Sequence, residues 1–283
     1  MRAFPRLRLG SKGIIGLIIV GLVFASALFS PFLAPHSPDK QDLLKTMQPP
    51  VWSGEGSTAN LLGTDRLGRD ILSRIIYGAR ISLLVAFSAV FLSGLMGSIL
   101  GLIAGYAGAV TQNVIMRIVD IVLSIPFILL ALVVTSVLGS SLFNLILVFV
   151  AVRWVQYTRI AFGQTLEVKA EEFVLACRSY GATTPRILFK HIAPNILSSI
   201  IVVATLELGF VIIMESGLSF LGLGVPPEIP SWGGMLQEGR SYINLAWWMT
   251  TFPGLAIVLT VLGFNFIGDW LREKLDPKAS VTD

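Results

Sequence analysis

Six long apolar segments restrict the fold of this chain more than any other feature of its sequence. A helix needs about 20 apolar residues to cross the roughly 30 Å hydrocarbon core of a bilayer. Only 13% of the residues are charged and 54% are apolar, which is about half the charge expected of a soluble domain. The sequence therefore predicts an all-α integral membrane protein with six transmembrane helices, at 13–33, 81–106, 118–138, 142–160, 196–221 and 245–267.

The first apolar segment follows a basic tail, 1–12, that contains no acidic residue. A cleaved signal peptide is the alternative, because Ala25-Ser26-Ala27 would fit a cleavage site. The apolar stretch exceeds the usual signal-peptide core of about 7–15 residues, so we expect a retained first span. Positive residues favour the cytoplasmic side of a membrane, and six spans then place both termini in the cytoplasm.

This topology divides the chain into parts with different surroundings. A short basic tail precedes the first span, and a long polar loop outside the membrane follows it. The predicted parts are the cytoplasmic tail 1–12, the first transmembrane helix 13–33, the outer loop 34–80, a five-helix core 81–270 with a cytoplasmic loop at 163–195, and a cytoplasmic tail 271–283.

The most polar stretch in the second half of the chain is 171–195, EEFVLACRSYGATTPRILFKHIAPN. Apolar residues at helical spacing, Phe173, Cys177 and Tyr180, predict a first short amphipathic helix. Gly181 is expected to end it in the left-handed conformation that a glycine adopts without strain.

A second short helix is expected after that glycine. Thr184 is predicted to cap it with its hydroxyl group, and Pro185 suits a first helical turn. Pro194 is predicted to end it. Positive residues flank both helices, so the segment is predicted to be a basic, amphipathic docking element for a soluble partner: Arg159, Lys169, Arg178, Arg186 and Lys190.

The end of the outer loop combines a short charged motif with an amphipathic stretch. The motif is GTDRLGRD, residues 63–70, in which Asp65, Arg69 and Asp70 are predicted to form a helix cap and surface ion pairs. Direct contact with a substrate is the alternative. Isoleucines and arginines alternate after it, so a helix on the membrane surface is expected up to the second span.

Two features are predicted inside the second and third spans. Ser93, Gly97, Gly101 and Gly105 recur every four residues, which leaves one helix face almost without side chains. In lipid this allows close helix packing, within the bundle or against a second subunit. Pro126 is expected to kink the third span.

The fifth span contains two carboxylates, Glu207 and Glu215. A charged residue at mid-membrane costs roughly 2.5–3.5 kcal/mol on insertion scales, so each should face protein or water rather than lipid. Two interpretations stay open for both: a translocation path or inter-subunit contact, and a satisfied structural hydrogen-bond network.

Motifs for enzyme chemistry are missing from the sequence. It has no phosphate-binding loop of the Gly-x-x-x-x-Gly-Lys-Ser/Thr type and no Gly-x-Ser-x-Gly elbow. The two histidines, His36 and His191, have no metal-ligand spacing. The chain is therefore predicted to have no catalytic or metal-binding residues, and its modest positive charge does not indicate nucleic-acid binding.

Three separated segments resemble one family of transport proteins. Residues 176–194 resemble the cytoplasmic EAA loop of binding-protein-dependent ABC importer permeases, although Leu175 and His191 depart from its pattern. Residues 63–70 are close to a signature of the C-type permease subunit of dipeptide, oligopeptide and nickel importers. Residues 215–240, with LSFLGLG, PSWG and MLQEGR, resemble the same subfamily.

The resemblance implies an ABC type I importer permease-like fold and assigns roles to particular residues. It implies that a coupling loop contacts the ATPase, and that an outer segment carries the subfamily signature. The coupling residues are Glu172, Ala176, Cys177, Gly181, Ala182, Arg186 and Pro194, and the signature residues are Gly63, Thr64, Asp65, Gly68, Arg69 and Asp70.

The resemblance also implies partners and a location. These are a homologous second permease subunit, two ATP-binding subunits that hold ATP and magnesium, an extracytoplasmic solute-binding protein and the lipid of the cell inner or plasma membrane. No cofactor is expected on this chain. The expected solutes are di- or oligopeptides, with nickel chelates, opines or another small solute as alternatives. An ion-coupled secondary transporter using Asp120, Glu207 and Glu215 is a further alternative.

Overall fold

The computed structural model describes residues 10–275, so residues 1–9 and 276–283 of the two predicted tails lie outside the described residues. The described part is nearly all helical and contains no strand beyond an isolated bridge between Thr64 and Asp70. Its elements are α1 (Ser11–Leu28), α2 (Ser30–Leu33), η1 (Leu43–Lys45), α3 (Ile71–Tyr106), α4 (Ala109–Leu123), α5 (Phe127–Leu138), α6 (Leu142–Lys169), α7 (Glu172–Ser179), α8 (Thr184–Arg186), η2 (Ile187–Ile192), α9 (Ala193–Phe220), α10 (Trp232–Gly239), η3 (Arg240–Tyr242) and α11 (Trp248–Leu275).

Among the described residues, five continuous helical stretches are long and apolar enough to cross a membrane. They are α1, α3, α6, the stretch from α8 to α9, and α11. The pair α4 and α5 makes a sixth span if it is counted as one, and it is bent by 80°. The chain is thus an all-α, multi-pass integral membrane protein.

The bend between α4 and α5 differs from the predicted kink in a continuous span. Pro126 adopts extended backbone angles (φ −61°, ψ 124°) and precedes the first residue of α5. A proline disfavours the helical conformation in the residue before it, so the helix stops and restarts here instead of bending gradually. Helix α4 begins at Ala109, whereas the third span was predicted to begin at residue 118.

Helix α3 is longer than the second span predicted from hydropathy. It has 36 residues, about 54 Å at 1.5 Å per residue, and it includes the stretch that was expected to lie on the membrane surface. That expectation is wrong because α10, rather than lipid, covers the start of this helix. The indole of Trp232 is buried and donates a 2.9 Å hydrogen bond to the carbonyl of Ile75.

The small-residue face of α3 packs against α6 within this chain. A Cβ atom added to Gly97 would lie 2.2 Å from the carbonyl oxygen of Trp154, and one added to Gly101 would lie 2.5 Å from that of Thr158. The backbones are therefore in direct contact, as predicted for such a face. Trp154 and Tyr157 of α6 are both buried, Tyr157 completely.

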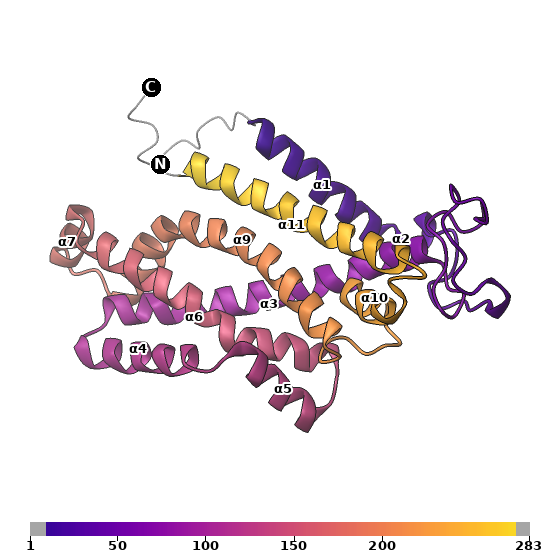
Figure 1. Ribbon diagram of the computed structural model, residues 1–283. Helices are drawn as coiled ribbons and strands as arrows, with labels where there is room; N and C mark the ends of the chain where they lie inside the picture. The colour runs from indigo at the N-terminus through magenta and orange to yellow at the C-terminus, as the bar shows by residue number, and fades with distance from the viewer. Residues whose placement is uncertain (1–9, 276–283) are drawn as a thin grey trace.

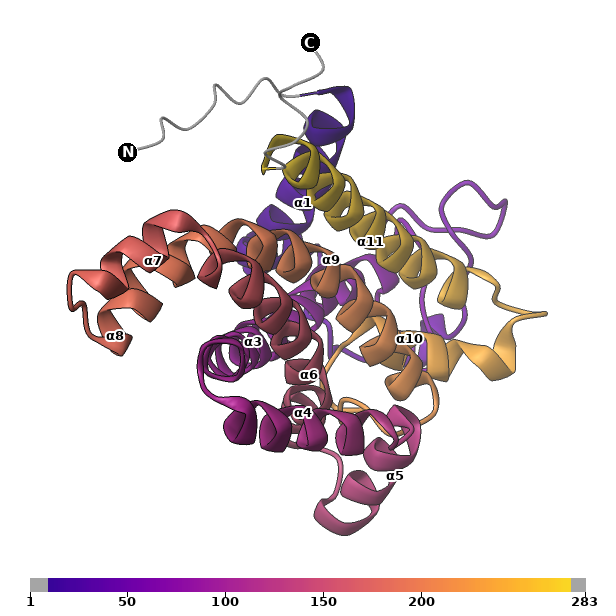
Figure 2. The same cartoon turned by 90° about the vertical axis from the view of Figure 1, so that its left-hand side faces the viewer.

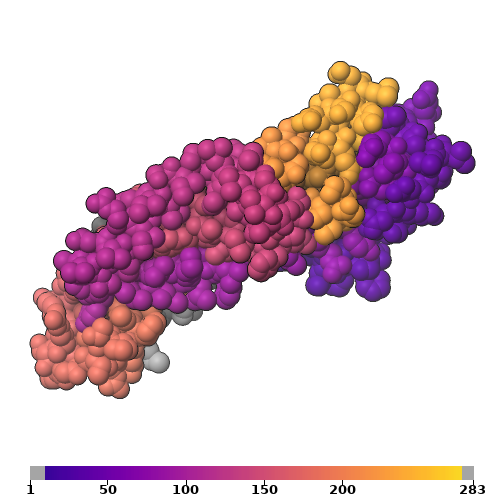
Figure 3. Space-filling model, turned by 90° about the horizontal axis from the view of Figure 1, so that it is seen from below, coloured from indigo at the N-terminus to yellow at the C-terminus, as the bar shows by residue number. Residues whose placement is uncertain are grey.

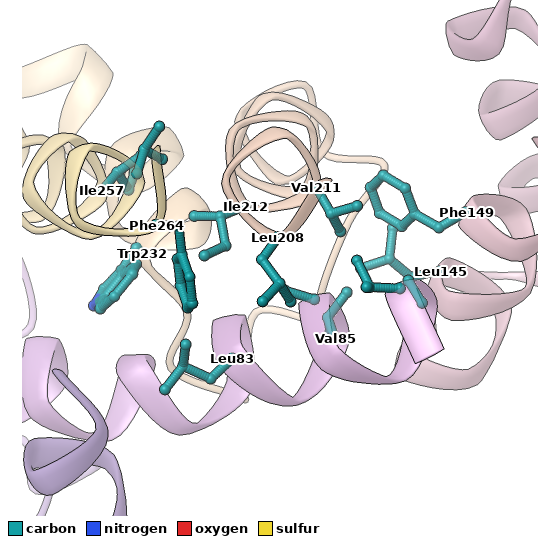
Figure 4. Close-up of a cluster of buried hydrophobic side chains, with 14 of the residues drawn as sticks. Leu83, Val85, Leu145, Phe149, Leu208, Val211, Ile212, Trp232, Ile257 and Phe264 are labelled. Carbon is teal, nitrogen blue, oxygen red and sulfur yellow. The ribbon is translucent and has the colours of Figure 1, made fainter. Parts of the chain in front are cut away.

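The hydrophobic core lies between α3, α6, α9 and α11 (Figure 4). Val85 of α3, Phe149 of α6 and Val211 of α9 are completely buried, and Figure 4 shows them pointing toward one another. On the other side of α9, Ile212 points toward Phe264 of α11. In lipid such contacts stabilise the bundle through close packing, because lipid tails are as apolar as the side chains themselves.

The molecule is elongated and has two different ends (Figures 1 and 3). The loop after α2 forms one end, and α7 and α8 form a projection at the other. A Cβ atom on Gly13 would lie 2.7 Å from the Trp270 ring, so the start of α1 and the end of α11 lie side by side. Both point away from the loop end (Figure 1).

Candidate functional site

The segment 171–195 folds as a short helical pair with a left-handed glycine between its parts. Gly181 has φ +79°, as predicted, and its N–H donates to the carbonyl of Arg178 at 3.0 Å. The second part begins at Thr184, and Pro185 lies in its first turn. The predicted hydroxyl cap is wrong: Thr183 occupies the cap position, and its side chain makes no capping bond.

The second part does not end at Pro194, contrary to prediction. Pro194 lies in the first turn of α9, so the helix runs on from α8 through the π-helical turn η2 into the membrane span. The wider turn displaces the backbone bonds just before the proline. The side-chain amide of Asn195 donates to the backbone carbonyl of His191 at 2.6 Å, so this carbonyl in the π-helical turn has a hydrogen-bond partner.

One face of the segment is anchored to the ends of the membrane helices. Val174, Ile187 and Ile192 are buried and pack in one cluster with Leu102 of α3 and Ala161 of α6. Figure 2 shows α7 and α8 held beside the ends of α6 and α9. The segment can therefore move only together with these helices.

The turn after α6 adds a polar anchor to this packing. Lys169 at the end of α6 donates hydrogen bonds to the carbonyls of Tyr106 (3.0 Å) and Gly105 (3.3 Å). These are among the last carbonyls of α3, which have no partner inside that helix. A positive charge is also favourable at a helix C-terminus.

The opposite face exposes large apolar side chains among positive ones, and we call it the coupling surface. Tyr180 is 91% exposed and Phe189 63% exposed. Phe173 and Leu175 are exposed as well, so the apolar stripe predicted to include Phe173 and Tyr180 faces outward, while Val174 faces the bundle. Of the residues predicted to couple, Cys177 and Ala182 are half-buried, and the exposed ones are Glu172, Ala176, Gly181, Arg186 and Pro194.

Glu207 lies at the middle of α9 and forms an ion pair with Arg153 of α6. The carboxylate accepts from Nε at 2.8 Å and also from Nη2. The Arg153 side chain is 20% exposed and that of Glu207 is 10% exposed. The guanidinium also lies over the ring of Phe210, 4.3 Å from its centre.

Glu215 is enclosed completely, unlike Glu207. Its carboxylate accepts from the hydroxyls of Ser219 (2.8 Å) and Ser82 (3.3 Å). The Ser219 oxygen in turn accepts from the backbone N–H of Val225 at 3.2 Å. This network joins α3, α9 and the turn after α9, and it favours the structural alternative for Glu215.

At the loop end, two residues of the charged motif 63–70 join Arg74 and Glu238 in a buried cluster of four charges. Asp65 Oδ2 pairs with Arg69 Nε and Arg74 Nη1, each at 2.6 Å. Glu238 of α10 pairs with both arginines, at 2.5 Å and 2.8 Å. Asp65 has no exposed surface, so the expectation of surface ion pairs is wrong. Two positive and two negative charges make the cluster neutral, which is what burial requires.

The predicted cap in this motif is confirmed at Asp70. Its Oδ2 accepts from the backbone N–H of Ser73 at 2.8 Å and so satisfies a free donor at the start of α3. Gly63 and Gly68 have positive φ angles that form the turns on either side. The carbonyl of Thr64 accepts from the indole of Trp248, which attaches the motif to α11.

The sequence interpretation missed Arg153, Arg74 and Glu238 as partners of the predicted residues. Glu238 lies in the segment MLQEGR, which was noted as a resemblance but not as an ion partner. Arg153 lies within the fourth predicted span, 142–160. A search for a positive residue to neutralise the mid-membrane Glu207 would have found it.

Two family models match the chain. One, the binding-protein-dependent transport system inner membrane component, matches residues 97–281. The other, the N-terminal TM domain of oligopeptide transport permease C, matches residues 3–50. The first match includes Gly97, Gly101 and Gly105 of the small-residue face of α3, the coupling surface and both membrane carboxylates.

Curated relatives match along nearly the whole chain. The dipeptide transport system permease protein DppC of Escherichia coli (strain K12) is 46% identical over 269 residues, which are 95% of this chain and 90% of the relative. The di/tripeptide transport system permease protein DppC of Pseudomonas aeruginosa (strain UCBPP-PA14) is 42% identical over 269 residues, with 95% and 89% coverage. The oligopeptide transport system permease protein OppC of Bacillus subtilis (strain 168) is 40% identical over 276 residues, with 98% and 88% coverage.

The fold also has a counterpart among solved structures. A chain of the MetNI methionine ABC transporter in inward-facing conformations matches with a TM-score of 0.61 and 20% identity. The match covers 73% of this chain and 98% of that one, and at this identity it shows the fold alone. With the family models and the curated relatives, it identifies the chain as a member of the binding-protein-dependent transport system inner membrane component family, a transmembrane permease subunit of an ABC importer.

Proposed function

We propose that this permease subunit forms one half of a translocation path for di- or oligopeptides and receives the force for transport at its coupling surface. The observation that carries the proposal is the two-sided form of segment 171–195. Its exposed face offers Tyr180 and Phe189 to a partner, and its buried face is packed on the ends of α3, α6 and α9.

The family's dependence on a binding protein and an ATPase defines the partners of the proposed complex. A homologous second permease provides the other half of the path, and two ATP-binding subunits contact the coupling surfaces from the cytoplasm. An extracytoplasmic solute-binding protein delivers the solute at the loop end. ATP and magnesium are held by the ATP-binding subunits, and this chain binds no cofactor.

The chemistry of the coupling surface supports contact with a protein partner. Aromatic and positively charged side chains are enriched at the centres of protein interfaces. Arg178, Arg186 and Lys190 are exposed in the same segment as Tyr180 and Phe189. These groups would insert into an apolar groove with an acidic rim on the ATP-binding subunit.

Transmission follows from the packing on the other face. Movement of an ATP-binding subunit would displace α7 and η2, and η2 is continuous with α9. The displacement would therefore reach Glu207 through a continuous helix, without any flexible linker. Rigid-body motion of helix groups of this kind is the usual route between outward-open and inward-open states.

The proposed solute class comes from the relatives, whose names specify dipeptide, di/tripeptide and oligopeptide transport. The binding protein selects the solute in systems of this kind, so the same machinery could carry a nickel chelate, an opine or another small solute. Measuring the affinity of the binding protein that acts with this permease for each of these solutes distinguishes the cases.

The test is isolation of the tagged chain from its native membrane in a mild detergent, with mass spectrometry of the bound subunits. The unaltered chain should retain a second permease and two ATP-binding subunits. Gly181→Val forces a β-branched residue into a positive φ that it does not tolerate, and it should release the ATP-binding subunits but keep the second permease.

Gly108→Val is the matched control. Gly108 also has open space where its Cβ would lie, but its φ of −71° suits valine. This variant should keep all subunits. Recovery of the unaltered chain without ATP-binding subunits, or their full retention by Gly181→Val, would contradict the proposed coupling surface.

A further inference from the structure

The ion pair between Arg153 and Glu207 leaves part of the guanidinium unused. Arg153 donates to Glu207 through Nε and Nη2 only. Within residues 10–275, no hydrogen bond reaches its Nη1 atom. A guanidinium has five N–H donors in a fixed planar fork, so one edge of this side chain is free to bind another acceptor.

Other arginine pairs in the chain differ from this one in exposure. Arg69 also donates through Nε and Nη2 only, to Asp65 and Glu238, but its side chain is 10% exposed and lies inside the cluster of four charges. Arg74 donates through Nη1 and Nη2 to Asp65 and Glu238, and its side chain is 3% exposed, so burial leaves no room for a further ligand. Arg159 pairs with Asp120 at 2.8 Å, but both side chains are about half exposed. Arg153 combines partial enclosure with an unused edge.

The position of Arg153 rules out lipid as the neighbour of that edge. The residue lies 11 positions after the start of α6 at Leu142, about 16 Å along the helix and so near the middle of the roughly 30 Å hydrocarbon core. Polar groups at this depth are costly unless they face protein or water. At this depth the exposed edge should face the space shared with the second permease rather than lipid.

Polar residues continue along the same side of α6 and α9. Gln156, about one turn from Arg153 toward the coupling surface, is exposed. Further toward the coupling surface, Ser199 of α9 is 3.5 Å from the side-chain oxygen of Gln164. A lipid-facing surface has no reason to carry this row, whereas the wall of a water-filled path does.

We propose that the free edge of Arg153 binds the carboxylate of a peptide as it passes through the membrane. The inference rests on the proposed function and names the chemical group recognised at the middle of the path. A planar guanidinium edge and a carboxylate fit each other in a bidentate geometry. The exposed ring of Phe210 supports the guanidinium from one side.

Glu207 makes this site suitable for transport rather than for tight binding. An unpaired arginine in a low-dielectric environment would hold a carboxylate strongly. Because Glu207 already neutralises Arg153, the passing carboxylate is attracted by the remaining donors alone. A site on a transport path must bind strongly enough to admit the solute and weakly enough to release it.

The test uses the complete transporter in proteoliposomes, with a free peptide delivered by saturating binding protein. The readout is peptide taken up per ATP hydrolysed. Arg153→Lys keeps the charge and the pairing with Glu207 but loses the fork. It should lower the ratio by roughly tenfold, as expected for one charged hydrogen bond, with normal subunit assembly. Arg117→Lys changes an exposed arginine of α4, and this matched control should change neither uptake nor ATP hydrolysis.

A double-mutant cycle identifies the recognised group. The second change is in the solute: the same peptide with its C-terminal carboxylate converted to an amide, at a concentration that saturates the binding protein. If Arg153 reads the carboxylate, amidation should slow the unaltered transporter and have little further effect in Arg153→Lys. If Arg153→Lys and amidation each lowered uptake by the same factor whether or not the other change was present, the proposal would be overturned.

The charge-swapped variant, Arg153→Glu with Glu207→Arg, separates recognition from structure. It keeps an ion pair between α6 and α9 but places the guanidinium on α9. The subunits should therefore assemble normally, while the peptide taken up per ATP hydrolysed stays low. Full recovery of uptake would mean that the pair is structural only. Normal uptake by Arg153→Lys would overturn the carboxylate site alone, whereas absence of peptide uptake by the unaltered complex would overturn the proposed function as well.

Discussion

Arg74 is the residue on which the outer end of the molecule depends most. Its guanidinium bridges Asp65 of the loop and Glu238 of α10, which are separated by more than 160 positions in the chain. Buried ion pairs contribute little net stability when complete, but removal of one partner leaves an uncompensated charge. The cluster therefore holds the loop and α10 in one arrangement around the start of α3.

Replacing Arg74 by methionine should destabilise the protein. Methionine fills a similar volume but leaves Asp65 and Glu238 with Arg69 as their only positive partner, so stability should fall by about 3–5 kcal/mol. Lys45→Met removes an exposed pair with Asp42 and should cost less than about 1 kcal/mol. Heating the detergent-purified protein and measuring the monodisperse fraction by gel filtration tests this. Equal losses in both variants would contradict the role of the cluster.

The sequence supports some of these residue assignments and not others. The cap at Asp70 follows from a local pattern, since an aspartate before a helical run bonds to the nearby N–H groups. The pairing of Arg74 with Glu238 could not be predicted, because no local rule connects residues so far apart. The unused edge of Arg153 depends on the exact geometry of two packed helices, which hydropathy does not describe.

At the scale of elements, the contact between α3 and α6 is the most extensive and the closest in the bundle. The hydroxyl of Thr158 donates to the carbonyl of Gly97 at 3.1 Å, so the two helices are joined by a hydrogen bond as well as by packing. A Cβ atom on Gly101 would lie 2.6 Å from the Ala161 Cβ. The backbones cannot approach this closely unless glycine occupies these positions.

Gly101→Ala should therefore weaken the bundle. The helices would have to separate, at a cost of about 1–3 kcal/mol or more, although alanine favours helix by about 1 kcal/mol over glycine. Gly21→Ala in α1 has open space at its Cβ and should have no effect or stabilise slightly. Thermal unfolding followed by gel filtration measures both. A stabilised Gly101→Ala variant would refute the close contact.

Hydropathy predicted the membrane helices well because their length and composition are local properties. Two departures have physical causes that lie outside each segment. The start of α3 continues as helix because Trp232 of α10 covers it, and Pro126 stops a helix instead of kinking it. The interpretation of Pro194 failed because a proline is tolerated in a first helical turn, and a π-helical turn precedes it.

For the whole molecule, the two ends differ in structure, and the long helices connect them. The buried ionic cluster stabilises the loop end, and the coupling surface projects from the other end (Figure 1). Four long helices, α3, α6, α9 and α11, share one core between them. Force applied at the coupling surface can therefore reach the middle of the membrane without a separate linker.

We expect ATP hydrolysis by partner subunits to drive solute movement through this permease, and peptide uptake by the reconstituted transporter measures this coupling. Proteoliposomes that contain all subunits should take up peptide only with ATP and magnesium on the side of α7 and with binding protein on the side of the loop. Ionophores that remove ion gradients should leave uptake unchanged. Uptake by this chain alone, driven by an ion gradient without ATP, would contradict the account.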